Sequence, residues 1–276
     1  MSEGNRVVVV TGLGGMGLAV VQRLGQGSTV VLADISETTL SSTAQILRSA
    51  GYDVVEQVTD VSEEDSVAAL TKVAIGVGRV EVVVHTAGVS PVQASVEAIL
   101  RVDLIGAALL LDAFSRVIAP GGAGVFISSM AGSLAPLDPD LERRLMDSAT
   151  ADLLTLPELS VDVVADPGTA YMLAKRANQL RVRSAAPAWG RRGARVNSIS
   201  PGIISTPMGN AELAGPNGEF MRGMVAGSPA GRVGTAHDIA SAVEFLAGPG
   251  ASFISGTDLL VDGGVVASLL AHPQAG

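Results

Sequence analysis

The chain has 276 residues, with 33 Gly and no Cys, and its 18 basic and 27 acidic side chains give a net charge of −9. This length suits one large domain or two small ones. The acidic balance argues against a nucleic acid or an anionic membrane as partner. Without Cys there are no disulfides or thiolate sites, and three scattered His give no reason to expect a metal centre. Apolar runs are shorter than the roughly 20 residues that span a bilayer, so we expect a cytoplasmic protein.

Short apolar runs alternate with helical patterns along the chain. Seven such runs, suited to strands buried on both faces, are Arg6–Val10, Ser28–Asp34, Tyr52–Val58, Val80–His85, Gly124–Ser129, Arg195–Ser200 and Thr257–Val261. Helices are predicted over Leu18–Leu24, from a Ser36 cap to about Ala50, from Ser62 onward, and over Ser95–Ile118, Gly168–Trp189 and Thr235–Leu246. This alternation predicts a single α/β domain over residues 1–276, a Rossmann-type, doubly wound, seven-stranded parallel sheet with helices on both faces.

Two segments rich in Gly or Pro leave the carboxyl ends of strands, where open α/β sheets bind their ligands. The first, 133–167, is long for a connection in a compact domain. Within it, Leu141, Leu145 and Ala149 recur at four-residue spacing, which predicts a short amphipathic helix. We expect this insertion near the active site, either as a lid or against the neighbouring helices, with a disordered loop as the alternative. The second segment, 205–229, is expected to cover the substrate.

The glycines of Gly12-Leu-Gly14-Gly-Met-Gly17 match the pattern G-x-G-x-x-G between the first strand and a helix. Backbone N–H groups and the helix dipole at such a turn bind a pyrophosphate. A plain tight turn is the alternative in a chain this rich in Gly. Asp34 ends the second strand, where a carboxylate can accept both ribose hydroxyls of an adenosine. Asp34 would repel a 2′-phosphate and has no Arg or Lys beside it in sequence, which favours NAD over NADP. A plain helix cap is the alternative for Asp34.

Tyr171 and Lys175 stand four residues apart on the long predicted helix, so their side chains share one face. A phenol with a pKa near 10 is a poor acid or base at neutral pH. A neighbouring ammonium favours the phenolate, which predicts a general acid/base suited to an alcohol or a carbonyl. Ser129, at the end of the fifth predicted strand, can bond the substrate oxygen from the other side. The alternatives are a helix-surface contact for the pair and a satisfied strand-end hydroxyl for Ser129.

At this point the sequence resembles the short-chain dehydrogenase/reductase family, from Arg6 to about Val265. The motifs that carry the resemblance are Thr11–Gly17, Asp34, Asp60-Val61, Ala87-Gly88, Ser129–Gly132, Tyr171-xxx-Lys175, Asn197-xxx-Pro201-Gly202, Thr206 and Asp262-Gly263-Gly264. The resemblance implies that Ser129, Tyr171 and Lys175 are catalytic. It also implies cofactor contacts from Gly12, Gly14, Met16, Gly17, Asp34, Asp60, Val61, Thr86, Ala87, Gly88, Tyr171, Lys175, Pro201, Gly202, Ile204 and Thr206. Among these, Asp60 and Val61 would frame the adenine, and Pro201 to Thr206 would hold the nicotinamide carboxamide.

The chain departs from the family pattern at several points. The glycine loop is one residue shorter, and His85-Thr86-Ala87-Gly88 replaces Asn-Asn-Ala-Gly. Asp103 stands where the family has an active-site Asn that supports a water beside the Lys, which makes Asp103 a candidate fourth catalytic residue whose charge would alter the titration of the pair. Ser129 and Tyr171 lie 42 residues apart, about 28 more than in most members. This insertion suggests the 3α-hydroxysteroid dehydrogenase/carbonyl reductase branch.

The sequence therefore predicts an NAD(H)-dependent oxidoreductase that transfers a hydride between nicotinamide and a secondary alcohol or ketone, with Tyr171 as acid/base. Only 3% of residues are aromatic, so aliphatic pocket walls and an apolar substrate, such as a terpenoid or steroid, are expected. The alternatives are an NADPH-dependent 3-oxoacyl-thioester reductase and a non-catalytic NAD-sensing protein. We expect a homo-oligomer, a tetramer as is common in the family or a dimer. The dimer would use the last helix and strand Thr257–Val261 if the insertion blocks the usual helix pairing.

Overall fold

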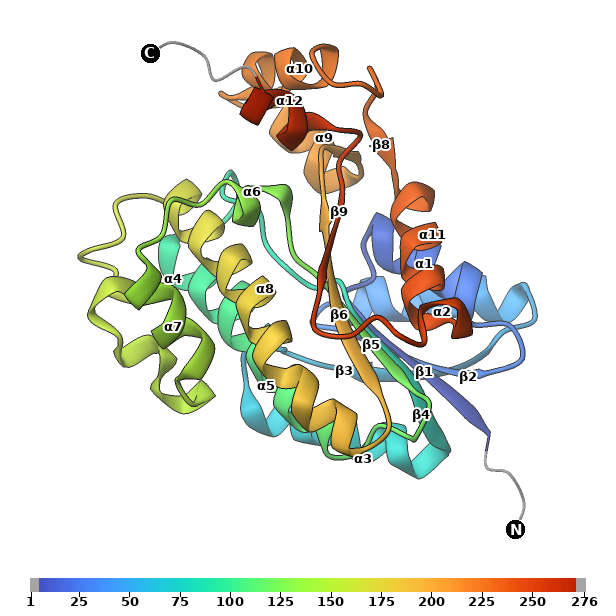
Figure 1. Ribbon diagram of the computed structural model, residues 1–276. Helices are drawn as coiled ribbons and strands as arrows, with labels where there is room; N and C mark the ends of the chain where they lie inside the picture. The colour runs from blue at the N-terminus through green and yellow to red at the C-terminus, as the bar shows by residue number, and fades with distance from the viewer. Residues whose placement is uncertain (1–4, 272–276) are drawn as a thin grey trace.

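The computed structural model describes residues 5–271. Seven strands form one parallel sheet in the order β3-β2-β1-β4-β5-β6-β9 (Figure 1). They are β1 (Arg6–Thr11), β2 (Thr29–Asp34), β3 (Asp53–Val58), β4 (Arg79–His85), β5 (Ala123–Ile127), β6 (Arg195–Pro201) and β9 (Asp258–Val261). The short strands β7 (Ile204–Ser205) and β8 (Gly234–Thr235) pair separately. The predicted fold class, a seven-stranded parallel Rossmann-type sheet in one domain, is confirmed.

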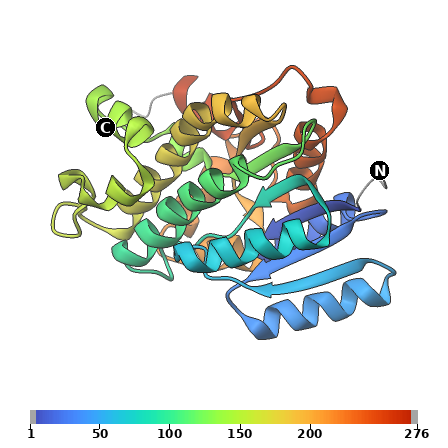
Figure 2. The same ribbon diagram turned by 90° about the horizontal axis from the view of Figure 1, so that it is seen from below.

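Helices cover both faces of the sheet, since its central strands are apolar on both sides. On β1, Val8 and Val10 pack into one apolar cluster and Val7 and Val9 into the other, as the two-residue period of a strand requires. The first cluster lies under α1 (Gly15–Leu24), α2 (Glu37–Ser49) and α11 (Ala236–Ala247). The second lies under α3 (Glu64–Val77), α5 (Gly106–Ser115) and α8 (Pro167–Arg191), which run side by side in Figure 2.

The order of the strands reverses between β1 and β4, so the loops that follow these two strands lead to opposite faces of the sheet. Such a switch point opens a crevice at the carboxyl ends of the strands. Gly12 has a φ of +82°, and a Cβ there would lie 2.4 Å from the backbone nitrogen of Ala87. The close approach of the two loops therefore requires glycine at this position.

Several predicted boundaries differ in the structure, most of them by one to three residues, and three of the differences have a clear physical reason. The helix expected over Ser95–Ile118 is divided into α4 (Val96–Ile99), a π-helical turn η1 (Leu100–Ile105) and α5, because the backbone widens by one residue around Asp103. Strand β5 ends at Ile127, so Ser129 caps the short helix α6 (Met130–Ser133) rather than ending the strand. Helix α3 begins at Glu64, because the Ser62 hydroxyl donates to Asp60 instead of capping the helix.

The insertion is folded and lies against α8 (Figure 1). It consists of α7 (Pro139–Asp147) and the 3₁₀ turns η2 (Thr150–Thr155) and η3 (Pro157–Leu159). The predicted amphipathic helix is present and buries Leu141 and Leu145, but Ala149 lies beyond its end and is exposed. The buried Arg181 of α8 donates to the carbonyls of Leu145 and Ser148. Of the two places expected for the insertion, it occupies the side of the neighbouring helices.

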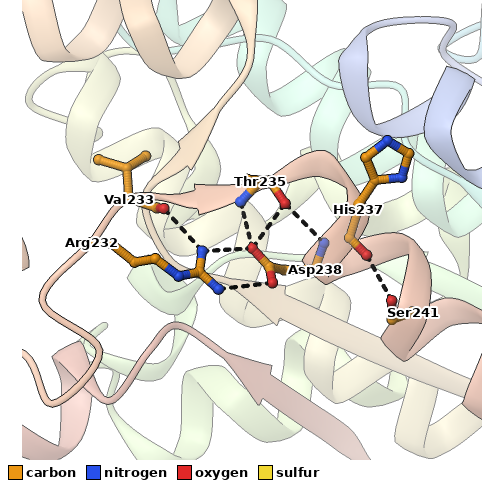
Figure 3. A network of polar contacts seen from close by, with 6 residues as sticks. All are labelled: Arg232, Val233, Thr235, His237, Asp238 and Ser241. Atoms are coloured by element: carbon orange, nitrogen blue, oxygen red, sulfur yellow. Dashed lines mark hydrogen bonds and ion pairs between the residues drawn. The ribbon is translucent and has the colours of Figure 1, made fainter.

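The C-terminal part of the chain builds a cap beyond the carboxyl ends of β6 and β9, at the top of Figure 1. The cap holds α9 (Pro207–Ala214), α10 (Gly218–Ala226) and α12 (Val265–Ala271); the 3₁₀ turn η4 (Pro249–Ala251) lies between α11 and β9. Helix α11 begins with a capping box, in which the Asp238 carboxylate accepts the Thr235 N–H and also pairs with Arg232 (Figure 3). No helix within residues 5–271 is long and apolar enough to cross a membrane.

Candidate active site

A cavity of about 360 Å³ opens where the loops after β1 and β4 diverge. The glycine loop forms one wall, and no side chain caps the N-terminus of α1 at Gly14. A Cβ on Gly14 would meet no atom within 4 Å, whereas one on Gly17 would lie 1.9 Å from the Gly12 carbonyl oxygen. The free N–H groups at the start of α1 thus face open space that can hold a phosphate group.

Asp34 lies at the rim of this cavity, at the end of β2. Its two oxygens accept the backbone N–H groups of Leu13 (2.7 Å) and Ser36 (2.9 Å), which fix the carboxylate in place. Each carboxylate oxygen has a second lone pair, so Asp34 can still accept hydrogen bonds from a ligand. Asp60 lies further along the wall and accepts both the N–H and the hydroxyl of Ser62. Among the residues that line the cavity there is no Lys or Arg.

Tyr171 and Lys175 lie next to the cavity on α8, with the Lys175 Nζ 5.3 Å from the centre of the Tyr171 ring. The Ser128 hydroxyl donates to the Lys175 carbonyl (2.7 Å) and ties the helix to the end of β5. The Ser129 oxygen accepts the N–H of Ala131, and a hydrogen bond from Ser129 to the Tyr171 phenol lowers the pKa of Tyr171 in part. The buried Ser128 therefore positions α8, while the partly exposed Ser129 is available to a substrate.

Asp103 lies on the π-helical turn and is completely buried. Its Oδ1 accepts the Val89 N–H at 2.8 Å, and its Oδ2 lies 3.6 Å from the Lys175 Nζ. A Cβ on Gly88 would lie 2.9 Å from Asp103 Oδ1 and 3.3 Å from Lys175 Nζ. Glycine at position 88 therefore leaves the space in which Asp103 and Lys175 approach each other. The Asp103 carbonyl accepts from Asn178, one turn beyond Lys175.

Burial and charge act against each other at these groups. Burial is the largest influence on Tyr171 and raises its pKa; the Lys175 ammonium lowers it and Asp103 raises it, and the net pKa lies above the ordinary value. Burial lowers the pKa of Lys175, but Asp103 and Tyr171 outweigh it and the net pKa is raised. Burial also raises the pKa of Asp103, against the effect of Lys175. The lowering of the Tyr171 pKa expected from Lys175 is therefore outweighed by burial, and Asp103 alters the titration of the pair as expected.

The comparisons with known proteins cover nearly the whole chain. The family model described as "short chain dehydrogenase" matches residues 6–137, and the one described as "Enoyl-(Acyl carrier protein) reductase" matches residues 140–266. The short-chain dehydrogenase/reductase bsc3 of Alternaria brassicicola is 39% identical over 264 residues, 95% of this chain and 96% of its own length. The chain belongs to the short-chain dehydrogenase/reductase family. It is thus an oxidoreductase of a family that binds nicotinamide cofactors.

Two further relatives agree with this assignment. The cis-4-hydroxycyclohexanecarboxylate dehydrogenase of Sinomonas cyclohexanicum is 31% identical over 275 residues and covers 95% of this chain and 97% of its own length. The crystal structure of levodione reductase superposes with a TM-score of 0.76 at 26% identity, and the match covers 96% of this chain and 98% of the other. The placement within a branch of the short-chain dehydrogenase/reductase family stays a prediction.

The structure brings most of the predicted cofactor residues of this family member to one place. The cavity is lined by Gly12, Gly14, Met16, Gly17, Asp34, Asp60, Val61, Thr86, Ala87, Gly88 and Thr206. Five predicted residues do not line it. Tyr171 and Lys175 lie beside the cavity on α8, Pro201 is buried at the end of β6, Gly202 packs against Asp262, and Ile204 belongs to the core under α11. The expected carboxamide site between 201 and 206 is therefore represented at the cavity by Thr206 alone.

Sequence reasoning missed several residues at this site. Ile35 directly follows Asp34 and lines the cavity with 65% of its surface exposed, and Pro207 and Met208 extend the wall that begins at Thr206. The position of Ile35 directly after a candidate ribose-binding carboxylate was visible in the sequence and could have placed it at the cavity. Burial lowers the pKa of His85, at the end of β4, to about 3, and the Thr11 hydroxyl lies 2.7 Å from its Nδ1. It is a neutral, buried ring.

Proposed function

We propose that this short-chain dehydrogenase/reductase transfers a hydride between NAD(H) and a secondary alcohol or its ketone, with Tyr171 as the general acid/base. The observation that carries the proposal is the placement of Tyr171 and Lys175 on one face of α8, beside the glycine-lined cavity, with the Ser129 hydroxyl next to the Tyr171 phenol. Acid/base, ammonium and hydrogen-bond donor are the groups that a carbonyl reduction requires.

The preference for NAD(H) rests on Asp34. Its carboxylate is fixed at the cavity rim by two backbone N–H groups and has no Lys or Arg beside it among the lining residues. It would accept the ribose hydroxyls of NAD and repel the additional phosphate of NADP. The fold itself does not decide, since a blue fluorescent protein of similar fold, 24% identical with a TM-score of 0.73, is in complex with NADPH.

Each catalytic side chain has a separate task in the proposed reaction. The bound nicotinamide supplies the hydride for reduction or accepts it in oxidation. Ser129 donates its hydroxyl to the substrate oxygen and fixes its direction. Tyr171 gives its phenolic proton to that oxygen during reduction and takes a proton from the alcohol during oxidation. Lys175, held charged beside Asp103, stabilises the phenolate that reduction leaves behind.

We propose an apolar, ring-sized substrate. Tyr171 packs against an apolar cluster that includes Leu173 and Val164, and α9 lies over the loop after β4, where Gly215 approaches Val92. The cis-4-hydroxycyclohexanecarboxylate dehydrogenase is named for a cyclic alcohol, which supports the ring, although its substrate also carries a carboxylate. A panel of cyclic and open-chain secondary alcohols, with NADH formation as readout, identifies the preferred member.

Tyr171→Phe tests the proposed function. The variant removes only the phenolic hydroxyl, so turnover should fall to below a few percent of the wild-type value while NADH binds within a few fold, because the glycine loop and Asp34 hold the nucleotide. The matched control is Tyr52→Phe, since Tyr52 is the one other Tyr and donates to the Gln22 carbonyl. Turnover by Tyr171→Phe that equals the control would remove Tyr171 from the acid/base role.

The two other functions considered from the sequence fit the site less well. A 3-oxoacyl-thioester reductase that uses NADPH conflicts with the fixed carboxylate of Asp34. A non-catalytic NAD-sensing protein would not need Ser129, Tyr171 and Lys175 beside the cavity. Assembly into a dimer or tetramer stays a prediction, and the insertion that covers one side of α8 supports the dimer.

A further inference from the structure

The carboxylate of Asp103 is buried beside the ammonium of Lys175. Burial raises the pKa of Asp103, and Lys175 and the Val89 N–H lower it in part. Asp103 is fully buried on the π-helical turn, with Oδ1 accepting the Val89 N–H and Oδ2 facing the Lys175 ammonium at 3.6 Å. Within the described residues Oδ2 has no hydrogen-bond partner. A proton on Oδ2 would place a buried O–H donor against an ammonium, with no acceptor for it. The ionised pair avoids this and offsets the cost of burying either charge alone.

The pairing of Asp103 with Lys175 changes the electrostatic effect of Lys175 on the Tyr171 phenol. The charged groups that face the phenol are Lys175 on its own helix, Asp103 on η1 and Glu212 on α9, while the nearby His85 of β4 is neutral. Lys175 alone would favour the phenolate. Asp103 opposes that effect because its charge lies beside the ammonium, and Glu212, which accepts from Ser90, adds a smaller repulsion.

We propose that Asp103 is a positioning residue that compensates the charge of Lys175 and so opposes the ionisation of the Tyr171 phenol. This inference rests on the proposed function for its consequence. Ketone reduction consumes the phenolic proton, so the site is set for reduction around neutrality. Alcohol oxidation needs the phenolate to take the hydroxyl proton, so it gains rate only at alkaline pH.

The test exploits the presence of only two Tyr in the chain. In a Tyr52→Phe protein without ligand, the phenolate absorbance reports Tyr171 alone. With Asp103 intact, Tyr171 should titrate above the ordinary value of about 10. Asp103→Asn keeps the shape and removes the charge, and should lower the titration midpoint by about one pH unit. Asp103→Ser also removes the charge and should lower the midpoint in the same way, so it replaces Asp103→Asn if that variant folds poorly. The matched control is Glu97→Gln, an exposed carboxylate of α4 paired with Arg101, which should leave the midpoint unchanged.

The pH profile of turnover gives the second readout, which a merely structural role would not move. Asp103→Asn should remain active, and its rate of alcohol oxidation should reach its plateau about one pH unit lower than that of the wild type. A Tyr171 midpoint at or below 10 with Asp103 intact, or an equal midpoint in Asp103→Asn, overturns the inference. If the Tyr171 midpoint shifts in Asp103→Asn but Tyr171→Phe retains turnover, the charge compensation stands and the proposed function fails. If the midpoint does not shift but Tyr171→Phe loses turnover, the proposed function stands and the inference fails.

Discussion

The cavity between β1 and β4 and the insertion on α8 are held together in opposite ways. At the cavity the contacts are made by backbone: glycines without side chains let Gly12 approach Ala87 and leave the N-terminus of α1 open. In the insertion the contacts are made by side chains, with Leu141, Leu145, Leu153, Leu159 and Val164 joining α4, η1 and α8 in one apolar cluster. A change in the first region should therefore affect ligand binding, and a change in the second should affect stability.

Leu145→Ala should produce the larger loss of stability in this comparison. The side chain is fully buried between α7 and α8, and truncating such a Leu costs about 2–5 kcal/mol of the free energy of unfolding. NADH affinity of the folded variant should stay within a few fold. Urea unfolding and an NADH titration measure the two quantities. Val163→Ala, in the same insertion but 61% exposed, is the control and should change neither; an equally small effect of both variants would show that the insertion is not part of the core.

Gly17→Ala should weaken NADH binding and leave the protein folded, the opposite pattern to Leu145→Ala. A Cβ at position 17 would lie 1.9 Å from the Gly12 carbonyl, so the loop must move away from the geometry that holds a phosphate. We expect NADH affinity to fall about a hundredfold, or about 2.7 kcal/mol, in a protein that still folds. Gly76→Ala on the exposed face of α3 meets no atom within 4 Å and should bind NADH normally. Unchanged affinity in Gly17→Ala would place the nucleotide elsewhere.

The cavity and the insertion also differ in how well the sequence predicted them. The strands, the sheet and the glycine loop follow from local patterns, namely buried β-branched runs and fixed glycine spacing, and eleven of the predicted cofactor residues line one cavity. The structure of the insertion was predicted only in part. Helix α7 was predicted because Leu141 and Leu145 repeat at helical spacing, whereas the two 3₁₀ turns were not, because they depend on contacts with other parts of the chain.

The net direction of the pKa changes at the proposed catalytic residues could not be predicted from the sequence. The spacing of Tyr171 and Lys175 indicated that they share a face, but the net rise in the pKa of Tyr171 depends on burial and on Asp103. Asp103 reaches Lys175 only because a π-helical turn presents it and Gly88 leaves room. The role of Asn178 in fixing the Asp103 carbonyl has no sequence signal of its own.

The central claim is that the fixed carboxylate of Asp34 selects NAD over NADP. The most direct test is to compare kcat/KM of the enzyme with the two cofactors. The wild type should prefer NAD by about ten- to a hundredfold, or 1–3 kcal/mol, because Asp34 faces the added phosphate without a neighbouring cation. Asp34→Asn should narrow that ratio, whereas Glu37→Gln, an exposed neighbouring carboxylate on α2, should not. Equal kcat/KM for the two cofactors in the wild type would contradict the account.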